Sequence, residues 1–178
     1  MRVEEAMAAA RDCGFEVAAP LDPAKLEFRQ DIRDMCAPDK CRNGYGKSWS
    51  CPPAGFPLAE LTERAQKHTQ GIIVQTICHM EDPFDFDSVR ETAKQHSQNF
   101  IALTDALLAT GENIFPMGAG SCRRCEKCTY PDQPCRFPGR MITSMEASGL
   151  FVSQVCKDND LPYYYGENTV AYSSCVLL

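Results

Sequence analysis

The hydrophobic and polar positions of the chain follow two periods, one helical and one extended. Four segments carry apolar residues three and four positions apart, which predicts amphipathic helices. These segments are residues 2–13, 57–68, 87–110 and 143–156. Pro57 suits a first helical position and Asp87 suits an N-cap, while residues 143–146 (TSME) match a capping box.

Short apolar runs bounded by Gly, Pro and Asn predict strands. The predicted strands are residues 15–19, 25–29, 71–78, 114–117, 162–165 and 169–177. The helix between 71–78 and 114–117 predicts a parallel crossover, and the turn at 166–168 predicts a final hairpin. The pattern therefore predicts an α/β fold, a single domain over residues 1–178 whose one mixed sheet is flanked by helices.

Cysteine is the unusual component of the chain, at 11 of 178 residues. The chain opens without the apolar stretch of a secretory signal, and no apolar run reaches the 18 residues of a membrane span. We therefore expect a cytoplasmic protein, in a compartment where disulfides are rare and clustered cysteines are typical of metal sites. A net charge of −6 and a pI near 5.1 argue against a nucleic-acid partner.

Basic residues gather where the cysteines gather. Residues 36–53 and 120–140 hold seven of the 11 cysteines and a formal charge of +5, against −11 for the rest of the chain. Nearby cations stabilise thiolates, which are the form that binds metal. We therefore expect the four arginines of the second segment to balance an anionic metal site: Arg123, Arg124, Arg136 and Arg140. Two solvated basic loops are the simpler alternative.

The spacing C-x2-C-x2-C-x6-C in residues 120–140 is the strongest chemical signal. Its members are Cys122, Cys125, Cys128 and Cys135. Three thiolates at intervals of three can reach three irons of one cubane, and a fourth beyond a Pro-rich turn can reach the last, much as in bacterial ferredoxins. A four-cysteine zinc site is the alternative, but zinc sites usually use two separated C-x2-C pairs. The spacing favours a [4Fe-4S] cluster.

A second centre is predicted from Cys36, Cys41 and Cys51, which are spaced C-x4-C-x9-C and end in Cys-Pro-Pro. The fourth ligand is missing locally, and Cys78, at the end of the predicted strand 71–78, is the first candidate. Other candidates are Cys13, Cys156, Cys175, His79 and Asp39. Alternatively, no protein ligand fills the position, which leaves an iron open to water or substrate. The predicted α/β domain thus carries two cysteine-rich metal-binding loops.

The two cysteine segments together carry a family resemblance. The motifs C-x4-C-x-N-G-Y-G-K-x-W-S-C-P-P, G-x-C-x2-C-x2-C-x6-C-R-F-P and S-M-E-A-x-G resemble domain-of-unknown-function family 2284 over residues 30–178. The resemblance implies metal binding of the iron–sulfur type through the seven motif cysteines, and it supplies no reaction. Cys78 is not one of the motif residues.

The sequence therefore predicts an iron–sulfur protein with two [4Fe-4S] clusters that passes single electrons to or from a redox partner protein. Two alternatives stay open. One is an enzyme whose Cys36/Cys41/Cys51 cluster offers an open iron for substrate binding or reductive chemistry. The other is a zinc-stapled structural module. Neither nucleic acid nor a membrane is an expected partner, and the sequence does not fix the oligomeric state.

Overall fold

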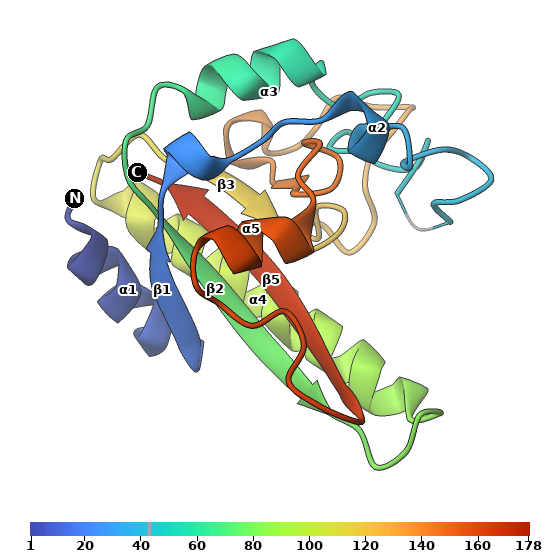
Figure 1. Ribbon diagram of the computed structural model, residues 1–178. Coiled ribbons are helices and arrows are strands. Elements are labelled where there is room, and N and C mark those ends of the chain that lie inside the picture. Colours follow the sequence, from blue (N-terminus) through green and yellow to red (C-terminus); the bar gives the residue numbers. More distant parts are fainter. Residues whose placement is uncertain (43) are drawn as a thin grey trace.

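The strands of the computed structural model form one mixed sheet (Figure 1). The structure describes residues 1–42 and 44–178, and within them the sheet has five strands in the order β1-β2-β5-β3-β4. Their bounds are β1 Val17–Leu21, β2 Gly71–His79, β3 Phe115–Gly118, β4 Thr143–Ser144 and β5 Thr169–Leu177. Neighbouring strands are antiparallel except for β3 and β4, which are parallel. The predicted α/β fold with a mixed sheet is confirmed.

Helices cover both faces of this sheet. The helices are α1 Val3–Asp12, α2 Gln30–Arg33, α3 Leu58–Ala65, α4 Phe86–Ala109 and α5 Val152–Asp158, with 3-10 turns η1 Pro23–Lys25 and η2 Pro138–Arg140. Side chains alternate across a strand, so Ile72 and Val74 of β2 pack with α1 and α4, whereas Ile73 packs with α3 and α5. All three are fully buried, and each such burial contributes about 1.5–3 kcal/mol.

The C-terminal strand lies at the centre of the sheet. β5 pairs with β2 along all nine residues and with β3 on its other side, so β2 and β3 are parallel, as expected, but not adjacent. The predicted hairpin is wrong, because residues 162–165 form no strand. The side chain of Gln75 donates to the Pro162 carbonyl (2.9 Å) and accepts from the Tyr165 hydroxyl (2.6 Å). Gln75 shares its face of β2 with Ile73, so these bonds hold the segment over the sheet rather than beside β5.

Residues 143–156 were expected to form one helix, and the structure divides them. They begin as strand β4, turn at Gly149 and only then enter α5. Gly149 has a φ of +80°, which suits glycine, and a β-carbon there would lie 2.6 Å from the Arg29 carbonyl oxygen. The capping-box residues serve this turn instead, because the Ser144 hydroxyl accepts from the backbone N–H of Ala147 at 2.9 Å.

Two smaller expectations also differ from the structure. Residues 25–29 are not a strand, since the chain first forms the 3-10 turn η1, whose N-cap is Asp22. Helix α4 is capped by Asp85 rather than Asp87, because the Asp85 carboxylate accepts from the backbone N–H of Ser88 at 3.1 Å. Both differences arise from an acidic side chain that binds the backbone two or three residues further on.

The two cysteine segments lie side by side outside the sheet. The first joins α2 to α3 and the second joins β3 to β4, and both are at the upper right of Figure 1. The backbone N–H of Cys122 in the second segment donates to the hydroxyl of Ser50 in the first, at 3.1 Å. The fold thus brings together two loops about 70 residues apart in sequence. Within the described ranges, no helix combines the length and apolarity needed to cross a membrane.

Candidate metal centre

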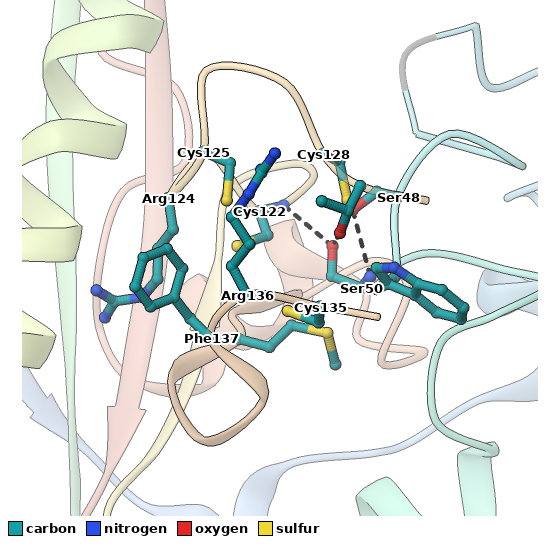
Figure 2. A pocket seen from close by; sticks show the side chains of 12 residues that line it. Ser48, Ser50, Cys122, Arg124, Cys125, Cys128, Cys135, Arg136 and Phe137 are labelled. Atoms are coloured by element: carbon teal, nitrogen blue, oxygen red, sulfur yellow. Dashed lines mark hydrogen bonds between the residues drawn. The ribbon is translucent and has the colours of Figure 1, made fainter. Parts of the chain in front are cut away.

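Four cysteines of the second segment line one narrow pocket (Figure 2). The polar side chains around it are Cys122, Cys125, Cys128, Cys135, Ser48, Ser50, Thr129, Arg124 and Arg136. The pocket has about 20 Å³ of free space, so the thiols nearly fill it as it stands. The structure therefore gathers the four cysteines that the spacing groups, and adds two serines from the first segment.

A hydrogen-bonded turn returns the chain to this pocket after Cys128. The hydroxyl of Thr129 donates to the Pro134 carbonyl at 2.9 Å, and the backbone N–H of Gln133 donates to the Thr129 carbonyl at 3.0 Å. These two bonds close the loop between Cys128 and Cys135. The six residues between the last two cysteines are therefore a compact turn that returns the fourth thiol to the pocket.

The Cys128 thiol is surrounded by hydrogen-bond donors. Burial raises its pKa, but the backbone N–H groups of Tyr130, Trp49 and Thr129 and the hydroxyl of Ser48 together hold the pKa of Cys128 below its ordinary value. Hydrogen bonds of this kind favour the thiolate, which is the metal-binding form. The sulfur of Cys128 is thus prepared to carry negative charge.

The four arginines occupy different positions around the pocket. Arg124 and Arg136 line it, Arg123 lines a second pocket that Cys122 also borders, and Arg140 lies on the surface. The Arg124 side chain is 7% exposed and pairs with a carboxylate that the sequence did not point to, Asp105 of α4, at 2.9 Å. That hydrogen bond holds the pKa of Asp105 below its ordinary value, so Arg124 is both fixed and partly neutralised.

The three cysteines of the first segment line a different kind of space. Cys36, Cys41 and Cys51 border a cavity of about 650 Å³, together with Glu146 and Tyr163. Gly44 allows the close approach of the loop, because a β-carbon there would lie 2.7 Å from the Cys51 sulfur. The structure therefore groups these three thiols as the sequence does, and faces them with a large open volume.

Burial and mutual charge act against the thiolates of this cavity. Burial, with smaller contributions from the thiols of Cys36, Cys41 and Cys122, raises the pKa of Cys51 to about 11. Burial, followed by the charges of Cys41 and Glu146, also raises the pKa of Cys36. These thiols must lose their protons when they bind a metal, so metal loading of this centre releases protons and is favoured at higher pH.

Cys78 lies elsewhere in the molecule. It is 1% exposed on β2, opposite Val170, and it does not line the cavity of the first segment. The second segment, which lies beside the first, leaves the sheet near Ser174, because the backbone N–H of Ala119 donates to the Ser174 hydroxyl. Ser174 pairs with Val74 of β2. Cys78 is four residues beyond Val74, so it lies about 13 Å along the strand from this point. None of the other candidate fourth ligands borders the cavity either: Cys13, Cys156, Cys175, His79 and Asp39. Glu146 does border it, although the sequence pattern presented Glu146 only as a helix cap.

A pair of buried serines joins the two groups of cysteines. The hydroxyls of Ser48 and Ser50 are 2.9 Å apart, and both residues are less than 5% exposed. Ser48 also bonds the Cys128 thiol, while Ser50 lies 3.8 Å from the Cys51 sulfur and accepts from the backbone N–H of Cys122. This Ser48–Ser50 pair therefore touches cysteines of both segments.

Trp49 fastens the same contact from outside. Its indole N–H donates to the Gln133 carbonyl at 3.0 Å, and its ring meets Tyr130 edge-on at 5.0 Å between centroids. The Ser-Trp-Ser-Cys segment, residues 48–51, thus joins the two loops through non-covalent contacts. The signal for it in the sequence is the alternation of the two serines around an aromatic residue directly before Cys51.

The cysteines in their present positions do not converge on one point. Within residues 1–42 and 44–178, no three His, Cys, Asp or Glu side chains are placed to hold a single metal ion.

A comparison with protein families finds that the model for "predicted metal-binding protein (DUF2284)" matches residues 19–178. No curated protein and no solved structure matches the chain.

Proposed function

Since this chain belongs to the DUF2284 family of predicted metal-binding proteins, we propose that it holds two [4Fe-4S] clusters and transfers single electrons to or from a partner protein. The observation that carries the proposal is the pocket of the second segment, which four cysteines line together with hydrogen-bond donors and arginines. Four thiolates, one for each iron, are the usual donor set of a cubane.

The donor set of each loop fits such a group. Cys122, Cys125, Cys128 and Cys135 would hold one cluster, and Cys36, Cys41 and Cys51 would supply three ligands to the other. When bound, a cluster of this type supplies a one-electron couple. The remaining work belongs to the chain, which must exclude water from the sulfurs and set the potential.

The hydrogen-bond donors and cations of the pocket set that potential. The N–H groups directed at Cys128 and the guanidinium groups of Arg124 and Arg136 stabilise added negative charge, so they raise the reduction potential. The formal charge of +5 on the two loops also suits an acidic partner surface, because complementary charge speeds the encounter.

The narrowness of the pocket favours a second candidate, a zinc-stapled interaction module. A free space of about 20 Å³ is closer to the needs of one ion than of a cluster, and four cysteines are a common structural zinc set. Iron–sulfur binding requires the two loops to separate at this pocket. Zinc binding requires the thiols to move toward one point, which they do not share at present.

Metal analysis of protein purified without oxygen separates these functions. The proposal expects a brown protein with about eight irons and about eight acid-labile sulfides per chain, and a paramagnetic signal after reduction. A colourless protein with one or two zinc ions and no sulfide supports the structural module instead. A brown protein whose reduced form passes no electrons to small acidic carriers such as flavodoxin-type proteins contradicts the electron-transfer role.

A further inference from the structure

The turn between β4 and α5 is held by hydrogen bonds from within and by one neighbouring side chain. The backbone N–H of Ser148 donates to the Ser144 carbonyl at 2.9 Å, and the backbone N–H of Gly149 donates to the Glu146 carbonyl at 2.9 Å. From outside, the guanidinium of Arg33 bonds the Ala147 carbonyl. The backbone that carries Glu146 therefore has little freedom to move.

Glu146 is the one residue of this turn whose side chain leaves the core. Met145, Ala147 and Ser148 are all at most 1% exposed, whereas Glu146 is exposed and borders the cavity of about 650 Å³. In the described part of the chain, no hydrogen bond or ion pair occupies its carboxylate. A fixed turn thus presents a carboxylate to the space in front of Cys36, Cys41 and Cys51.

We propose that Glu146 is the fourth protein ligand of the centre held by Cys36, Cys41 and Cys51. The inference rests on the proposed iron–sulfur function. Among the described residues that border the cavity, Glu146 supplies the only carboxylate. The other oxygen donors there are hydroxyls such as those of Ser121, which are protonated at neutral pH.

Electrostatics agrees with this placement. Glu146 borders the same cavity as Cys36, Cys41 and Cys51. An iron between these groups would be shared by a carboxylate and its neighbouring thiolates, which removes their repulsion. Oxygen ligands hold iron less firmly than thiolates do, and the open cavity gives solvent access to that corner. The Glu146 corner is therefore the one from which iron should leave first.

The substitution Glu146→Gln tests the proposal. It removes the negative oxygen but keeps the size of an exposed side chain, so the fold should be retained, and circular dichroism checks this. Oxidation of a [4Fe-4S] cluster by one electron, with ferricyanide as the acceptor, gives a 3+ core that can release one Fe²⁺ and leave [3Fe-4S]⁺. Under mild oxidation we expect the wild type to keep about eight irons and Glu146→Gln to fall to about seven, with a [3Fe-4S] electron paramagnetic resonance signal in the variant.

Two further variants make the outcome specific. Glu126→Gln removes a comparable exposed carboxylate from the second segment and should behave as the wild type does. Glu146→Asp restores a carboxylate on a shorter stem and should regain part of the lost iron. If Glu146→Gln keeps its iron and its spectra unchanged while the wild type carries two clusters, Glu146 is a solvated charge and the inference is wrong. If the wild type itself takes up no iron, the proposed function fails and takes this inference with it.

Discussion

The two cysteine loops place their thiols in different surroundings. The second segment supplies four thiols from 14 consecutive residues and closes them around a pocket of about 20 Å³. The first supplies three thiols from 16 consecutive residues and leaves a cavity of about 650 Å³ in front of them. With the proposed function, this difference predicts a protected metal centre beside an accessible one.

The chemical state of the thiols follows the same division. Hydrogen-bond donors lower the pKa of Cys128 in the closed pocket, whereas burial raises the pKa of Cys51 to about 11 at the open cavity. A metal in the first centre must therefore provide more of the energy that deprotonates its ligands. The closed pocket should load first and lose its metal last.

The substitution of one cysteine should give the largest effect that distinguishes the closed pocket from the open cavity. Cys125→Ala should lose the iron of the closed pocket and keep that of the cavity, so the iron content should fall from about eight to about four per chain. The matched variant Cys41→Ala should do the reverse. Iron and sulfide analysis with electron paramagnetic resonance measures both. An iron content that Cys125→Ala leaves unchanged would mean that the second motif is misassigned.

Thiol reactivity in the metal-free protein gives the next largest effect. A thiol with a pKa of about 11 is about 0.1% thiolate at pH 8, whereas an ordinary thiol is about a quarter ionised. The lower nucleophilicity of acidic thiolates offsets part of this ratio. We expect iodoacetamide to label Cys128 at least about tenfold faster than Cys51, as read by peptide mass spectrometry.

The pH dependence has a definite sign. Because the pKa of Cys128 is lowered, its labelling should rise and level off at lower pH than that of Cys51, whose labelling should still increase above pH 9. Labelling in strong denaturant, where both cysteines are solvated, should remove the difference. Equal rates in the folded protein would contradict the contrast between the two loops.

The sequence predicts the closed pocket better than the open cavity, for a physical reason. The four thiols of the pocket lie within one loop, so their spacing along the chain carries the geometry. The cavity joins residues of the first segment to Glu146, about 100 residues away, and only the fold creates that contact. Residues 143–146 instead matched a capping box, a local pattern that β4 and its turn reuse.

Prediction of the fold from local sequence patterns meets the same limit. Helix α4 and strands β2 and β5 are long and periodic, and their patterns locate them to within two residues. The strand predictions for the short segments 25–29 and 162–165 were wrong, because an N-cap aspartate and the side chain of Gln75 decide their conformations. The pairing of β5 with β2 depends on tertiary packing, which no local pattern contains.

A glycine-to-alanine change should affect the cavity alone, by a smaller amount. In Gly44→Ala the new methyl group would lie 2.7 Å from the Cys51 sulfur, so the thiol must move. We expect partial loss of the iron at the cavity and full retention at the pocket, as followed by iron analysis and resonance signals. Gly139→Ala, where a β-carbon meets nothing within 4 Å, is the control and should change neither centre. Equal losses in both variants would contradict the role of Gly44.

The smallest expected effect concerns the Ser48–Ser50 pair, which contacts cysteines of both segments through single hydrogen bonds. Ser50→Ala removes the acceptor for the Cys122 N–H and the hydroxyl 3.8 Å from the Cys51 sulfur. A hydrogen bond is worth on the order of 1 kcal/mol, which is about 40 mV for a one-electron couple. Loss of a donor near the Cys51 sulfur destabilises the reduced state of the cavity centre, so its potential should fall by about that amount in redox titrations. The closed pocket loses only the acceptor of the Cys122 N–H, so its potential should change less. The control Ser97→Ala, whose hydroxyl donates to the Ala93 carbonyl of its own helix, should shift neither. If the potential of the cavity centre stays unchanged in Ser50→Ala, the Ser50 hydroxyl does not stabilise charge on the Cys51 sulfur.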